Sequence, residues 1–125
     1  VLKGALFSDD ERVTKNIRTK AESGDFTQGR KLVTPNVEGA CLIREKFSDE
    51  EIEAMGLWTV ITMHESIEDS GGSPDLLNAN RGGDGHWLDA YWDNPGNRWN
   101  HSDGFAFSLV TFFISLPCLR GSFVL

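Results

Sequence analysis

The stretch "LWTVITM", residues 57–63, decides the fold class, because it is the clearest strand signal in the chain. Four consecutive β-branched residues lie at its centre, and such residues are enriched in strands. An acidic, turn-rich loop, "EDSGGSPD" (68–75), follows it. We therefore expect 57–63 to be a strand that is followed by a turn.

The second half of the chain predicts further strands. "LLNAN" (76–80) and "HWLDAYW" (86–92), joined by "RGGDG", are typical of a hairpin, and "DNPGN" (93–97) predicts a tight turn. In "GFAFSLVTFFIS" (104–115) both odd and even positions are mostly apolar, which indicates a strand buried on both faces, at least over 104–110. A helical stripe also fits this segment, and the aromatic and β-branched content favours the strand.

The first half predicts helices. Ser8 and Glu11 form a capping box, and an apolar stripe of Val13, Ile17 and Ala21 follows it. A second capping box, Ser48 with Glu51, predicts a short helix that ends before Gly56; Phe47 and Ile52 are placed as its hydrophobic staple. Between these helices we expect mostly loop over 25–39 and a strand over 40–47.

Length and pattern together predict one α+β domain spanning 1–125. We expect one or two N-terminal helices and a compact, mostly antiparallel sheet. The longest apolar run, 105–116, is shorter than the roughly 20 residues of a membrane-spanning helix, so we expect a soluble, cytoplasmic protein with no membrane partner. Cys41 and Cys118 are isolated, which leaves either one disulfide or, as we expect, two reduced thiols.

Charge is unevenly distributed along the chain. Residues 64–103 hold 2 basic and 8 acidic side chains, whereas residues 1–63 hold 9 basic and 11 acidic ones. The acidic region has no basic stripe to meet a phosphate backbone, so a nucleic-acid partner is not expected. The same region favours cations or neutral sugars.

The acidic region is also the aromatic one. Residues 80–100, "NRGGDGHWLDAYWDNPGNRWN", contain three Trp, one Tyr and four Asn. Tyr and Trp supply contact area with few rotatable bonds, Asn and Gly supply adaptable hydrogen bonding, and flat rings beside amides suit sugar rings. This composition indicates a binding surface for a carbohydrate or a protein.

The block 76–107 resembles the C-terminal block of formylglycine-generating-enzyme-like proteins and of target proteins of diversity-generating retroelements. The matching residues are Asn80, Arg81, Trp87, Asn94, Pro95, Asn97, Arg98, Gly104 and Phe105. The resemblance implies a C-type-lectin-like fold that displays ligand-binding loops. The family places Arg after Gly-Phe, where this chain has Ala106, and this chain continues beyond the closing strand. The cysteine pair of the formylglycine enzymes has no counterpart, so their activity is not expected.

The resemblance and the composition together predict a non-enzymatic binding module. The predicted ligand-binding residues are Asn78, Asn80, Trp87, Tyr91, Trp92, Asn97, Trp99 and Asn100. Arg81 and Arg98 are expected to fix loops by bonding carbonyls or nearby Asp residues. Strand alternation predicts that Trp87 and Trp92 are partly core and that Tyr91 and Trp99 are the more exposed pair.

Two other classes of function stay open. His64, His86 and His101, with nearby carboxylates, are candidate residues of a small metal-dependent enzyme, although no metal-binding motif is present and no metal ligand is predicted. Calcium would suit either "EDSGGSPD" or a group of carboxylates, Asp84, Asp89, Asp93 and Asp103, but no cofactor is expected. The chain also fits an accessory protein of a mobile element that forms homo-oligomers through its apolar C-terminal segment, 105–125.

Overall fold

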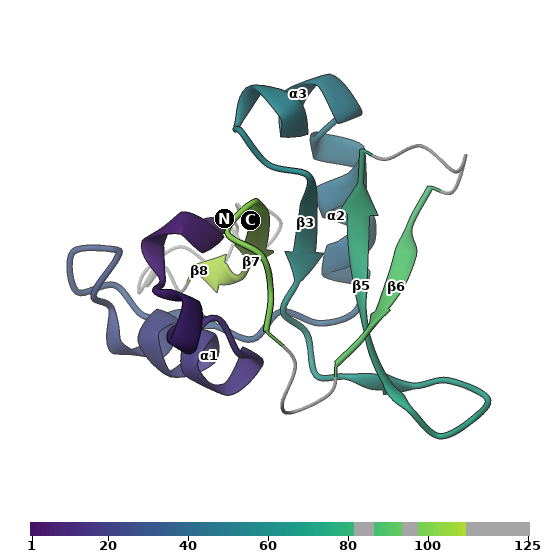
Figure 1. Ribbon diagram of the computed structural model, residues 1–125, viewed down its shortest axis with the longest axis horizontal. Helices are drawn as coiled ribbons and strands as arrows, with labels where there is room; N and C mark the ends of the chain where they lie inside the picture. Colours follow the sequence, from purple (N-terminus) through teal and green to yellow (C-terminus); the bar gives the residue numbers. More distant parts are fainter. Residues whose placement is uncertain (82–86, 94–97, 110–125) are drawn as a thin grey trace, which may run out of the picture.

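Strand β3 (Thr59–Thr62) lies inside the sheet of the computed structural model, within the stretch that predicts it (Figure 1). The structure describes residues 1–81, 87–93 and 98–109. The strand order is β1–β7–β3–β5–β4, and β6 also pairs with β5. The bounds of the other strands are Leu2–Lys3 (β1), Ile67–Glu68 (β4), Pro74–Asn80 (β5), Asp89–Trp92 (β6) and Asp103–Ala106 (β7).

The sheet is mixed but mostly antiparallel, as predicted. Strand β7 runs parallel to β3, whereas β1–β7, β3–β5, β4–β5 and β5–β6 are antiparallel. The predicted hairpin of 76–80 and 86–92 is confirmed as β5 and β6, with Leu76 opposite Tyr91. The predicted connections at 82–85 and 94–97 lie outside the described residues.

The closing segment forms two short strands instead of one continuous strand. After β7, residues Ser108–Leu109 (β8) pair with Leu32–Val33 (β2) in a separate two-stranded sheet. Phe105 and Ala106 are buried, and Phe107 and Leu109 pack against the main core. The start of the proposed oligomer segment is therefore core, while 110–125 lie outside the described residues, as does Cys118. Cys41 is a free, half-buried thiol.

The first helix begins later than its capping box predicts. Ser8 and Glu11 do form the box, but they cap a short 3-10 turn, η2 (Asp9–Glu11), which follows a similar turn, η1 (Gly4–Leu6). Helix α1 spans Thr14–Ser23, and buries the predicted stripe residues Ile17 and Ala21. The helix ends at Gly24, whose φ of 80° lies in the left-handed region, which glycine adopts without steric strain.

Residues 40–47 were predicted as a strand, and this prediction is wrong: most of them lie in helix α2 (Glu38–Lys46). The apolar residues Ala40, Ile43 and Phe47 follow helical spacing, so one side of the segment meets the sheet. The Asn36 side chain accepts a hydrogen bond from the Gly39 amide at 3.1 Å, which supports the helix start. A short apolar run can satisfy either period, and packing against the sheet selects the helix.

Helix α3 (Asp49–Ala54) confirms the second capping box. The Glu51 amide donates to Ser48 Oγ at 3.2 Å, and the Ser48 amide donates to Glu51 Oε1 at 3.3 Å. Ile52 is fully buried, with Phe47 packed in the same cluster. Within the described part of the chain, no helix has the length and apolar character needed to cross a membrane.

The two faces of the sheet carry two separate hydrophobic clusters. We call the face that Ile61 and Phe105 share the first face, and the face that Val60 and Ala106 share the second face. The first face packs against α1 and the N-terminal segment; its buried cluster is Leu2, Phe7, Ile17, Ala21, Leu32, Ile61, Met63, Leu76, Trp99 and Phe105. The second face packs against α2 and α3; its buried cluster is Ile52, Leu57, Val60, Ala79 and Ala106.

Candidate functional site

The first face changes from apolar to polar near the start of β3. The strand register places Thr59 opposite both Asn80 and Asp103, while Ile61 lies opposite Asn78 and Phe105. Thr59, Asn78 and Asp103 are all buried, although their side chains are polar. Buried polar groups require hydrogen-bonding partners, so the partners of these three side chains determine how this end of the face is arranged.

Hydrogen bonds connect these polar residues to strand β6. Thr59 Oγ1 lies 2.9 Å from Asn78 Oδ1 and 3.0 Å from the Ala79 carbonyl, and its hydroxyl serves as the donor. Asn78 Nδ2 donates to the Asp89 carbonyl at 3.2 Å. Two residues further along β5, Asn80 Nδ2 donates to the hydroxyl of Tyr91. The amides of β5 therefore hold β6 and the Tyr91 ring in place.

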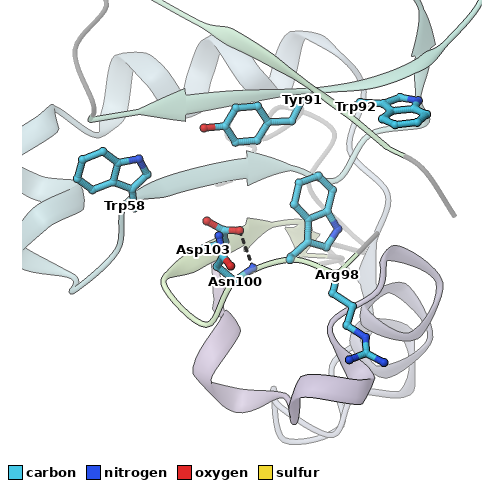
Figure 2. Close-up of a pocket in the computed structure, with 7 residues that line it drawn as sticks. Trp58, Tyr91, Trp92, Arg98, Asn100 and Asp103 are labelled. Atoms are coloured by element: carbon cyan, nitrogen blue, oxygen red, sulfur yellow. Dashed lines mark hydrogen bonds between the residues drawn. The ribbon is translucent and has the colours of Figure 1, made fainter. Parts of the chain in front are cut away.

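A hollow of about 460 Å³ lies beside this polar end, and we call it the aromatic pocket (Figure 2). Its lining residues come from the start of β3, from β6 and from the segment that leads into β7. They are Trp58, Tyr91, Trp92, Arg98, Trp99, Asn100 and Asp103. Four aromatic rings and one carboxylate thus meet although they lie up to 45 positions apart in the sequence.

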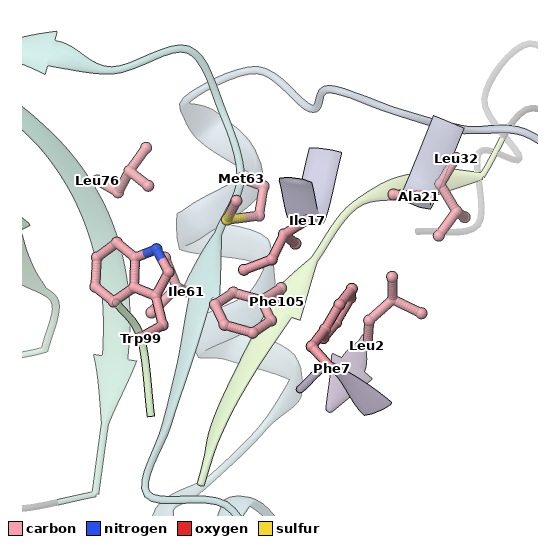
Figure 3. Close-up of a cluster of buried hydrophobic side chains, with 10 residues drawn as sticks. All are labelled: Leu2, Phe7, Ile17, Ala21, Leu32, Ile61, Met63, Leu76, Trp99 and Phe105. Carbon is pink, nitrogen blue, oxygen red and sulfur yellow. The ribbon is translucent and has the colours of Figure 1, made fainter. Parts of the chain in front are cut away.

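Trp99 forms the buried floor of the aromatic pocket. Only 6% of this residue is exposed, and its ring packs against Tyr91 and Phe105, each at a centroid distance of 6.4 Å. Figure 3 shows Trp99 beside Phe105 in the buried cluster. Its indole N–H donates to Thr14 Oγ1 at 3.0 Å, and the Thr14 hydroxyl donates to Asp93 Oδ1 at 2.6 Å. The start of α1 and the end of β6 therefore fix the orientation of the ring.

Trp58 and Trp92 are the accessible walls of the aromatic pocket. Their exposed fractions are 45% and 56%, and Figure 2 shows them on opposite sides of Tyr91. The Arg81 guanidinium lies 4.6 Å from the centroid of the Trp58 ring, in a cation–π arrangement. The Trp58 amide donates to the Ser102 carbonyl at 2.8 Å, so this residue is also tied to the segment before β7.

The exposure that strand alternation predicts for these rings is wrong. Trp87 and Trp92 are the exposed pair, whereas Tyr91 is half-buried and Trp99 is buried. The reason is that the inward side of β6 is the one that carries Tyr91, which lies opposite Leu76 on the first face. Trp99 lies outside any strand, and long-range packing buries it.

Asp103 supplies the carboxylate of the aromatic pocket. The residue is 4% exposed, and its Oδ2 accepts a hydrogen bond from the Asn100 amide at 2.9 Å. Burial raises the pKa of this carboxyl, and the Asn100 amide and the charges of Arg12 and His101 offset the rise only in part. Figure 2 shows the second carboxylate oxygen turned away from the Asn100 amide.

Several predicted ligand-binding residues meet at this pocket, and others do not. Tyr91, Trp92, Trp99 and Asn100 line it, with Asn80 bonded to Tyr91 directly behind. Asn78 is buried beneath, where its amide links β5 to β6, and the exposed Trp87 is not among the described lining residues. Asn97 lies outside the described residues.

Three lining residues were not among the predicted binding residues: Trp58, Asp103 and Arg98, for which only a structural role was expected. Trp58 belongs to the stretch that predicts β3 and carries no binding signal of its own in the sequence. Asp103 entered only as a candidate metal ligand, either for calcium or beside the histidines of the metal-dependent alternative. Its position next to the Gly-Phe pair, at the start of the closing strand, was the signal available for it.

The two arginines tie separate segments together. Arg98 Nη2 lies 3.3 Å from Asp10 Oδ1, which connects the pocket rim to η2. Arg81 Nη1 lies 3.5 Å from Glu53 Oε2 of α3. The expected structural role therefore extends beyond the loops that carry these residues, because both acidic partners are distant in sequence.

His64 links two strands in the core. The ring is fully buried; Nε2 accepts a hydrogen bond from the Leu77 amide at 3.0 Å. Because a backbone amide only donates, Nε2 carries no proton, and Nδ1 donates to the Glu65 carbonyl at 2.6 Å. The Nε2 bond thus links the segment that follows β3 to β5, and the Nδ1 bond fixes the ring against the neighbouring backbone.

The described residues offer no site for the metal-dependent alternative. Among them, no group of three His, Cys, Asp or Glu side chains is placed to hold a metal ion. His101 is exposed, and His86 lies outside the described residues together with Asp84. In the loop 68–75, Asp69 Oδ1 accepts hydrogen bonds from the amides of Gly71 and Ser73, so this carboxylate stabilises the turn itself.

A scan of protein-family models, a search of curated protein sequences and a search of solved structures gave no significant match to this chain.

Proposed function

We propose that the chain is a non-enzymatic binding module that holds a carbohydrate in the aromatic pocket. The observation that carries the proposal is the joint placement of exposed indole rings, Trp58 and Trp92, around a hollow with a buried carboxylate. Indole faces stack on the apolar faces of sugar rings, and carboxylate and amide groups accept hydrogen bonds from sugar hydroxyls.

The dimensions of the pocket support a small ligand. A volume of about 460 Å³ lies within the range of ordinary small-molecule sites and suits about one or two sugar rings. The floor is rigid, since Trp99 and Tyr91 are both held by hydrogen bonds and by ring packing. A rigid floor lowers the ordering cost of binding, which favours affinity.

The proposal agrees with the resemblance to lectin-like proteins, which stays a prediction, as does a link to a mobile element. A protein ligand is the other outcome that the composition of 80–100 leaves open. The same pocket would then hold a polar side chain of the partner.

A glycan-array screen tests the proposal, with a parallel peptide array for the protein alternative. Trp92→Ala removes an exposed wall of the pocket, and Trp87→Ala is the matched control, because Trp87 is equally exposed but does not line it. We expect Trp92→Ala to weaken glycan binding by about tenfold or more, and Trp87→Ala to leave it unchanged. Binding to peptides alone, or equal binding by the two variants, would refute the carbohydrate site.

A further inference from the structure

Among the described lining residues of the aromatic pocket, Asp103 carries the negative charge, and Arg98 carries a positive charge. Among the described residues, the carboxylate accepts one hydrogen bond, from the Asn100 amide, and forms no ion pair. Its second oxygen is therefore available to a ligand that enters the pocket (Figure 2). A buried carboxylate with a single neutral donor is poorly stabilised in its charged form, which is the reason that its pKa is raised.

The neighbouring cations are engaged elsewhere. The Arg98 guanidinium pairs with Asp10, and Figure 2 shows this side chain extending away from Asp103. Arg12 pairs with Asp9 and acts on Asp103 only through its charge, as does the exposed His101. Arg81 lies over Trp58 and beside Glu53.

We propose that the ligand of the aromatic pocket is an amino sugar with a free, protonated amine. The inference rests on the proposed function and names its ligand class. The ammonium group would donate to the free oxygen of Asp103 and supply the missing positive charge. Aromatic rings strengthen such a contact, because their faces attract cations, and Trp58, Tyr91 and Trp92 line the same pocket as the carboxylate.

The proposal separates closely related sugars. An N-acetylated sugar keeps the ring and most hydroxyls but loses the charge, so Asp103 would be buried further without a counter-ion. A sugar with a carboxylate would bring a second negative charge toward the first. Residues 64–103 hold 2 basic and 8 acidic side chains, and this net negative charge also favours a positively charged sugar, over a longer range.

The test compares two ligands that differ only in this group. A glucosamine disaccharide and its N-acetylated counterpart are titrated calorimetrically into the full chain, at a pH at which the amine is protonated and Asp103 is ionised. We expect the free amine to bind about tenfold more tightly or better, the range of a charge-assisted hydrogen bond. Asp103→Asn keeps an acceptor for the Asn100 amide, and should make the two affinities equal.

The other outcomes overturn either the amine inference alone or the proposed function itself. Equal wild-type affinities, or tighter binding of the acetylated form, overturn the amine inference and leave the carbohydrate proposal standing. Binding of the amine that persists in both Asp103→Asn and Trp92→Ala reflects general attraction to an acidic protein, and also overturns the inference. Absence of binding to every glycan on the array overturns the proposed function itself. Because the ligand pair is compared within the wild-type protein, the result does not depend on how well a variant folds.

Discussion

The two faces of the sheet differ in the size and polarity of the side chains that they carry. Strand β7 shows the difference within four residues: Gly104 and Ala106 belong to the second face, and Asp103 and Phe105 belong to the first. Small residues let α2 and α3 pack closely on the second face, where Gly39 of α2 lies against Thr62. The first face combines large rings with buried polar groups, and the aromatic pocket lies where the two kinds of residue meet.

The difference arises because side chains alternate along a strand, so neighbouring residues of β7 lie on opposite faces of the sheet. The second face is closed by short aliphatic contacts and has no polar group to offer a ligand at the corresponding place on β7. On the first face, Asp103 and Phe105 are two positions apart, so a carboxylate lies next to the aromatic core. The buried core includes Trp99, which also lines the pocket, and the polar end contributes Asp103 to the same lining.

The largest expected effect is on the first face. Phe105→Ala should lower the free energy of unfolding by about 3–5 kcal/mol, because Phe105 is fully buried between Phe7 and Trp99. Urea denaturation followed by tryptophan fluorescence measures the loss. The control, Leu6→Ala, alters a residue that is 51% exposed and should change stability by less than about 0.5 kcal/mol. A loss near that of the control would show that the rings on the first face do not hold the fold together.

On the second face, adding side-chain volume should lower stability, because the residues there are already closely packed. Gly104→Ala would place a Cβ 2.6 Å from Leu57 Cδ1 and 3.0 Å from Val1 Cγ1, closer than carbon atoms pack. We expect a loss of about 1–3 kcal/mol in the free energy of unfolding, measured by urea denaturation. The same substitution in a Leu57→Ala background should cost much less, since the main obstacle is then gone. An equal cost in both backgrounds would mean that close packing on this face is not the cause.

Much of the second face and of the sheet could be predicted from local sequence. The β-branched run gives β3, turn residues mark the β5–β6 hairpin, and the Ser48–Glu51 capping box gives α3, because each signal acts within a few residues. The helix over Glu38–Lys46 was missed because its local sequence signal is not decisive. Its short apolar pattern is ambiguous on its own, and only contact with the sheet decides between helix and strand.

The aromatic pocket was predicted in composition but not in geometry. Tyr91, Trp92, Trp99 and Asn100 were identified because residues 80–100 are rich in rings and amides. Which rings are accessible depends on distant residues: Thr14 fixes Trp99, and Ser102 positions Trp58. Neither contact has a sequence signal, so the alternation of β6 alone gave the wrong pair of exposed rings.

The smallest expected effect is the pH dependence of stability that Asp103 causes. Burial raises the folded-state pKa of this carboxyl above its ordinary value of 3.8, so the folded protein binds more protons than the unfolded chain between these two pKa values. The contribution of Asp103 to stability is therefore most favourable below pH 3.8, and it is lost as the pH rises through the raised pKa. Arg12 and His101 face the group and reduce the effect without cancelling it.

Asp103→Asn isolates this dependence. The variant keeps an acceptor for the Asn100 amide but has no proton to lose, so its free energy of unfolding relative to wild type should rise with pH and then level off. Urea denaturation of both proteins from pH 3 to pH 7 measures the difference, which we expect to be smaller than the cost of Gly104→Ala. A difference that stays flat, or falls with pH, would show that the carboxylate is adequately stabilised inside the protein. The Asp103 carboxylate would then be an adequately stabilised group of the first face, and it would not need a positively charged ligand.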